Sequence, residues 1–132
     1  MQKLEKPSKI LQKFIDFLEE SKSMYEYAKK KCEEFDSLDR HIYWAHRIEF
    51  AKDKNERNRI ATAHQKERLE RRRYKDICDQ YEKIHLFVCS ENNKATLKRM
   101  KGVVAAQKHQ EEYLESERHY NGKIQEEKRN ES

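Results

Sequence analysis

The sequence predicts an all-α protein built from long amphipathic helices that form a thin helical bundle or coiled-coil hairpin. The 132 residues include two glycines and one proline, whereas the turns between strands favour Gly, Pro, Asn and Asp. Charged residues make up 42% of the chain and hydrophobic residues 35%, which suits narrow apolar stripes better than a thick core. Apolar residues recur at steps of three or four, the spacing of one helix face.

Disorder is the competing interpretation of this composition. The recurrence of aromatic residues at helical spacing argues against it. We expect one helical domain over residues 1–120 and a frayed polar tail over 121–132. The predicted helices span 8–21, 24–53, 56–89 and 93–120.

The helix ends follow from local signals. Ser8 after Pro7 is the N-cap candidate of the first helix. The polar run Ser21–Ser23 predicts a short break, and Asp36–Ser37 is a second place where the chain could be interrupted. The loop over residues 90–93 is the clearest turn.

That loop predicts a hairpin between the last two helices, because a short connection folds neighbouring helices back on each other. The predicted seam sets Ile77, Tyr81 and Ile84 against Val104, Met100 and Leu97. At the outer end of the hairpin, Arg71 is expected near Glu111 or Glu115.

The positive charge is concentrated in one segment. Residues 52–75 hold ten Lys or Arg and four Asp or Glu, a surplus of six, and the whole chain carries +5. This surplus predicts a binding surface for nucleic acid or for an acidic protein. The partner-binding candidates are Arg68, Arg71, Arg72, Arg73, Lys75, Trp44 and Tyr43.

Each candidate also has a structural interpretation. The basic segment could be a solvated helix face with internal pairs, Glu67 with Arg71 and Glu70 with Arg73. The structural interpretation of Trp44 is a position on the flank of the bundle. The functional interpretation is an exposed side chain that anchors a partner.

No motif of catalysis is present: there is no phosphate-binding glycine loop, nucleophile elbow or H-E-x-x-H. We therefore expect a protein that is not an enzyme and has no catalytic, cofactor or metal site. A metal shared by Cys32, Cys78 and His85 is the alternative to cysteines that act as small core residues, and the core role is favoured.

The three cysteines show no paired spacing, which predicts reduced thiols in the cytoplasm. The N-terminus lacks the apolar run of a secretory signal. No stretch approaches the ~20 apolar residues of a membrane span, so we expect no membrane association.

Several short segments resemble a family of Lys/Glu-rich helical proteins of Gram-positive prophages and mobile elements. They are Leu38-Asp39-x-x-Ile42, His46-x-Ile48-Glu49-Phe50, Glu70-Arg71-Arg72-Arg73-x-Lys75-Asp76, Leu97-Lys98-x-Met100 and Arg118-x-Tyr120. The resemblance covers about residues 36–120 and leaves residues 1–35 unmatched. It implies a phage or mobile-element accessory protein in a bacterial host cell, where inhibitors of host defence, including anti-CRISPR proteins, are one class. It transfers no site residue.

These observations predict a non-enzymatic interaction protein that binds and modulates a host or phage protein. The alternative is a helical protein that binds nucleic acid, or a nucleoprotein complex, through residues 52–75. A structural coiled-coil oligomer is the third possibility. Because Ile10–Leu18 has apolar residues on nearly all sides, we expect a homo-oligomer formed through it.

Overall fold

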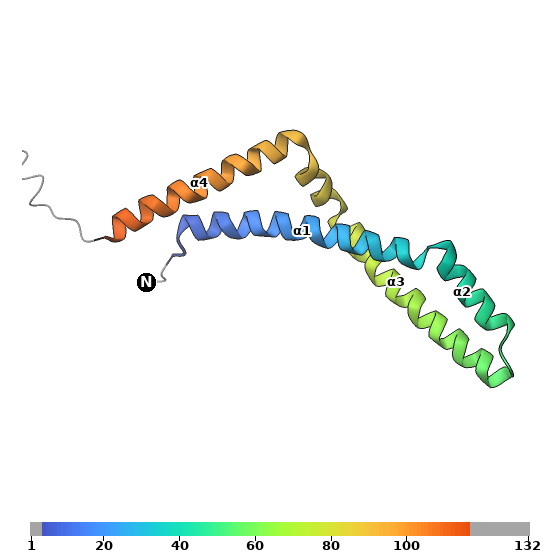
Figure 1. Cartoon of the computed structure of the whole chain (residues 1–132). Helices are drawn as coiled ribbons and strands as arrows, with labels where there is room; N and C mark the ends of the chain where they lie inside the picture. Colours follow the sequence, from blue (N-terminus) through green and yellow to red (C-terminus); the bar gives the residue numbers. More distant parts are fainter. Residues whose placement is uncertain (1–3, 117–132) are drawn as a thin grey trace, which may run out of the picture. The chain divides into compact units, whose positions relative to one another are not determined.

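The computed structural model describes residues 4–116, which form four helices (Figure 1). These are α1 (Pro7–Phe35), α2 (Leu38–Glu49), α3 (Lys54–Cys89) and α4 (Glu91–Glu115). About 90% of the described residues are helical and none lies in a strand. The predicted all-α fold is confirmed. The fourth helix begins at Glu91, so the loop predicted over residues 90–93 is wrong beyond Ser90. This helix ends at Glu115, and the predicted tail lies outside the described residues.

Contacts divide the chain into two compact units. Of the described residues, unit 1 contains 4–15 and 95–116, and unit 2 contains 16–94. Each unit has its own buried residues. The single helical domain predicted over residues 1–120 stays a prediction.

The break predicted at Ser21–Ser23 is wrong, because α1 continues through it to Phe35. The Ser21 side chain is buried, and its hydroxyl donates to the Phe17 carbonyl oxygen at 2.6 Å. A hydroxyl that bonds to the preceding turn is satisfied without leaving the helix. Ser21 therefore stays inside α1.

The chain is interrupted at Asp36–Ser37, so the helix predicted over 24–53 is divided between α1 and α2. Ser37 is the N-cap of α2: its side chain accepts the Arg40 backbone N–H at 3.2 Å. The same hydroxyl donates to the Glu34 carbonyl at the end of α1, at 2.9 Å. One serine thus satisfies orphan backbone groups of two helices.

The start of α3 is capped from both sides. The Asp53 carboxylate accepts the backbone N–H of Glu56 at 2.8 Å, and the Glu56 carboxylate accepts that of Lys52 at 2.9 Å. This exchange resembles a capping box displaced by one residue. It fixes the turn that reverses the chain between α2 and α3.

In unit 2, α3 runs antiparallel to α2 and to the second half of α1 (Figure 1). The order of the contacts shows the direction. Trp44 meets His64, Phe35 meets Tyr74 and Tyr25 meets His85, with ring centroids 5.1, 6.1 and 4.2 Å apart. Falling residue numbers on α2 and α1 accompany rising numbers on α3.

In unit 1, a carboxylate of α4 closes the N-terminus of α1. Glu111 accepts the Ser8 backbone N–H at 3.2 Å and the Ser8 hydroxyl at 2.7 Å. An anion at this end satisfies free N–H groups and complements the helix dipole. The Ser8 hydroxyl is the main cause of the lowered pKa of Glu111. Nearby, Lys6 Nζ lies 2.6 Å from Glu115.

These contacts correct one prediction. Pro7 is the first residue of α1, so Ser8 is inside the helix rather than its N-cap. Within unit 2, Arg71 pairs with Asp36, and the predicted contact of Arg71 with Glu111 or Glu115 stays a prediction. The apolar seam between Ile77–Ile84 and Leu97–Val104 stays a prediction.

The segment Ile10–Leu18 has an inner and an outer side. Ile15 and Leu18 are buried, whereas Ile10, Phe14 and Phe17 are about half exposed. The exposed residues are spaced by four and three, which places them on one face. Self-association through this face stays a prediction.

Replacing Ile15 by alanine should lower the free energy of unfolding by about 2–5 kcal/mol, the range for a buried isoleucine. The matched control is Ile10→Ala on the same helix, where the side chain is 54% exposed and the expected loss is under about 1 kcal/mol. Urea unfolding followed by circular dichroism measures both. Equal losses would contradict the buried position of Ile15.

Candidate binding surface on the α2–α3 hairpin

A single carboxylate on α3 holds α2 in place. Glu67 is 12% exposed and accepts the Arg40 Nε–H at 2.6 Å as well as the Trp44 indole N–H. Charge-assisted bonds of this kind are stronger than neutral ones. The bond to Glu67 is the main cause of the raised pKa of Arg40. Two donors from successive turns of α2 therefore share one acceptor.

Trp44 is a structural residue of the hairpin. It is 7% exposed and lies against the His64 ring of α3. The interpretation of Trp44 as an exposed partner anchor is therefore wrong, because its ring and its N–H are both used within the chain. Its neighbour Tyr43 is 41% exposed.

Tyr43 lies at the basic edge of α2. The guanidinium carbons of Arg40 and Arg47 lie 4.5 and 5.5 Å from the centre of its ring, within cation–π range. Arg47 also donates to the Tyr43 hydroxyl at 2.9 Å. This aromatic ring is thus held among cations while one side faces solvent.

A second ion pair joins α3 to the end of α1. The Arg71 guanidinium donates two bonds to Asp36, at 2.6 and 2.8 Å. Arg68 lies 3.9 Å from the same carboxylate. Hydrogen bonding from Arg71 is the main cause of the lowered pKa of Asp36. Arg71 and Arg68 therefore serve the fold.

The internal pairs predicted for the basic segment do not form. Glu67 binds Arg40 and Trp44 rather than Arg71. Glu70 and Arg73 are not within ion-pair distance of each other. Of the other predicted site residues, Lys75 pairs with Asp79 at 3.3 Å, while Arg72 and Arg73 are exposed.

Three exposed cations lie along one side of α3 at seven-residue spacing: Arg59, Lys66 and Arg73. Seven residues are nearly two helical turns, so these side chains leave the helix within about 20° of one direction and about 10.5 Å apart. Within the described residues, no carboxylate lies at ion-pair distance from any of them. With Arg47 of α2, we call this set the basic flank.

Hollows connect the members of the basic flank. One is lined by Arg47 and Arg59 together with Glu56, Ile60 and Ala63. The next is lined by Arg59, Lys66, Asn58, Thr62 and Ala63, and a third by Lys66, Arg73, Leu69 and Glu70. Because neighbouring hollows share lining residues, the basic flank is one continuous surface.

Sequence reasoning found Arg73 of this surface and missed Arg59, Lys66 and Arg47. The prediction was based on the densest run of cations, residues 68–75, in which consecutive side chains point about 100° apart around the helix. Arg71 and Arg68 of that run point toward α1. The repeat at 59, 66 and 73 was the signal that could have identified the flank.

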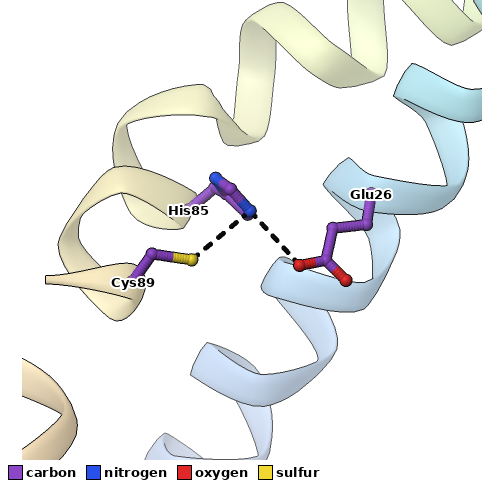
Figure 2. A group of neighbouring side chains, drawn as sticks. All are labelled: Glu26, His85 and Cys89. Atoms are coloured by element: carbon purple, nitrogen blue, oxygen red, sulfur yellow. Dashed lines mark hydrogen bonds and ion pairs between the residues drawn. The ribbon is translucent and has the colours of Figure 1, made fainter.

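Three metal-binding donors also meet in unit 2: Glu26 of α1 with His85 and Cys89 of α3 (Figure 2). Their donor atoms lie within 4.8 Å of one another. Within the described residues, Cys32, Cys78 and His85 do not come together as a group of metal donors. Cys78 is buried, and burial, with the nearby Cys32 thiol, raises its pKa.

Comparisons with models of protein families, with curated proteins and with solved structures found no match. Within residues 4–116, every helix is too short or too polar to cross a membrane.

The Asp36–Arg71 pair predicts a pH-dependent effect of Asp36→Asn. Because the pKa of Asp36 is lowered from 3.8 in the folded chain, its ionised form stabilises the fold above that pH. The stabilisation is lost as the pH falls through the lower, folded-state value. Urea unfolding should show a less stable variant at neutral pH and a vanishing difference at the acid end.

The control is Asp76→Asn, an exposed position outside the described ion pairs. It should change stability by less than about 0.5 kcal/mol. A loss in Asp36→Asn that is the same at every pH would contradict the contribution of the ion pair.

Proposed function

We propose that the chain is a non-enzymatic binding protein whose α2–α3 hairpin docks on an acidic protein surface. The observation that supports this function is the basic flank. On α3 it has three cations in one line that have no ion-pair partner among the described residues, and on α2 it has a fourth cation. An acidic helix laid alongside α3 offers a carboxylate at the same seven-residue repeat, as the charged edge positions of coiled coils do.

Apolar exposure favours a protein partner over nucleic acid. On α2, the Leu38 and Ile42 side chains are 73% and 56% exposed, and they are four residues apart on one face. Beside the cations, Leu69 is 52% exposed. Leu69 lines the same hollow as Lys66 and Arg73, so the basic flank carries apolar area next to its cations, as protein interfaces do. Leu38 and Ile42 leave α2 on the side away from Arg47 and form a separate exposed apolar face.

The biological setting comes from the resemblance to helical proteins of Gram-positive prophages and mobile elements. It supports an accessory factor that binds and modulates a host protein in the bacterial cytoplasm, with inhibitors of defence systems, including anti-CRISPR proteins, as one class. The alternative function is nucleic-acid binding, and the surplus of six positive charges over residues 52–75 is the observation that supports it.

Reversing Arg59, Lys66 and Arg73 to glutamate together tests the surface. The variant should lose the protein partners that the wild type captures from nuclease-treated lysate of a Gram-positive host, because each introduced glutamate repels the partner carboxylate that the original cation would attract. Quantitative mass spectrometry of both captures measures the loss. Circular dichroism establishes that the variant is folded.

The matched control reverses Lys29, Lys30 and Lys83, three exposed cations outside the basic flank. It makes the same change in net charge and should keep the captured partners. Equal capture by the two reversed variants would contradict a role for the basic flank.

Salt dependence separates the two partner classes. If duplex DNA is the ligand and the four cations contact phosphates, log K should fall against log salt with a slope of about −3.6. Fluorescence anisotropy of a labelled duplex measures this slope. Tight duplex binding with that slope, lost in the Arg59/Lys66/Arg73 variant, would favour the nucleic-acid function over the proposed one.

A further inference from the structure

Three side chains with different donor atoms converge between α1 and the last turn of α3. His85 Nε2 lies 3.4 Å from Glu26 Oε1 and 3.4 Å from Cys89 Sγ (Figure 2). His85 and Cys89 are four residues apart, so they project from the same face of α3. Glu26 reaches them from α1.

The 3.4 Å between His85 Nε2 and Glu26 Oε1 is longer than a good hydrogen bond from nitrogen to oxygen, which measures about 2.7–3.2 Å, whereas the same distance to Cys89 Sγ is ordinary for sulfur. One nitrogen also faces both other donors, and a single ring N–H cannot point at two atoms in different directions. Hydrogen bonding alone therefore leaves the cluster poorly satisfied. A cation at the common focus of the three atoms would bind all of them.

Two of the three separations match the edges of a tetrahedral zinc site. Zinc bonds of about 2.3 Å to sulfur and about 2.0–2.1 Å to nitrogen or oxygen place neighbouring ligand atoms about 3.4–3.6 Å apart. Both distances from His85 Nε2 are 3.4 Å. The donor atoms of Glu26 and Cys89 lie within 4.8 Å of each other, and the exposed Glu26 side chain is free to close this third edge around the ion.

The surroundings suit a bound dication. The His85 ring is 19% exposed and lies against Tyr25, with centroids 4.2 Å apart, so its direction is restrained. A thiolate and a carboxylate balance the two positive charges, and the thiolate–imidazole pair favours zinc over magnesium or calcium. Glu26 is 56% exposed, which leaves one side open to water.

We propose that Glu26, His85 and Cys89 form a zinc site that joins α1 to the C-terminal turn of α3. Zinc takes three protein ligands and a fourth ligand from water or from a bound partner. The Cys89 thiol releases its proton to solvent when the metal binds. This inference is independent of the proposed binding function.

Cobalt(II) tests the site directly, because a cobalt–thiolate bond gives a near-ultraviolet charge-transfer band and tetrahedral cobalt absorbs in the visible. Titration of the reduced chain should produce both bands and saturate at one cobalt per chain. Adding zinc should bleach them. Absence of the thiolate band at saturating cobalt would overturn the proposal.

The variants identify the ligands. Cys89→Ser and His85→Ala should each weaken cobalt binding more than about 100-fold, since even outer-shell changes cost 10–100-fold in metal sites. The control is the double variant Cys32→Ser and Cys78→Ser, which leaves Cys89 as the remaining thiol. It should keep both bands.

Loss of the bands in that control, or their persistence in Cys89→Ser, would assign the metal to other thiols and overturn the site. Circular dichroism of each metal-free variant separates loss of ligand from loss of fold. Zinc should also raise the melting temperature of the wild type and leave that of Cys89→Ser unchanged, because a ligand stabilises the state that binds it.

Discussion

The carboxylate of Glu67 determines where α2 lies, and much of unit 2 depends on it. With 12 residues, α2 is too short to be a stable helix alone. Glu67 gives it a fixed position by accepting bonds from Arg40 and Trp44. Without this acceptor, the buried indole N–H of Trp44 would lack its partner, which costs more than the bond itself contributes. The placement of Tyr43 and Arg47 beside α3 follows from it.

The helical repeat divides the basic segment between folding and binding. Cations on the side of α3 that faces α1 are paired, as Arg71 and Arg68 are with Asp36. Within residues 4–116, those on the basic flank have no carboxylate at ion-pair distance. The positive field of the flank is therefore not neutralised there, whereas Asp36 offsets the charge of the cations paired with it.

The metal cluster and the basic flank occupy different stretches of the same helix. Arg73 is 12 residues before His85, about 18 Å along the helix axis. Zinc at Glu26, His85 and Cys89 would fix α1 against the end of α3 and leave the flank exposed. The zinc site and the binding surface therefore use different residues, and either proposal can hold without the other.

The sequence by itself determined the all-α class, the end of α3 at Cys89 and the location of the positive surplus. These follow from glycine and proline content, three-four periodicity and local charge, all of which are properties of adjacent residues. The tertiary structure decided that α1 continues past Ser21, that Trp44 is buried and that Arg71 belongs to Asp36. The positions of Trp44 and Arg71 depend on side chains at least 20 residues away. Ser21 stays helical because its hydroxyl bonds to the Phe17 carbonyl and its side chain is covered. Hydrophobic spacing shows which face of a helix is buried but does not specify which helix covers it.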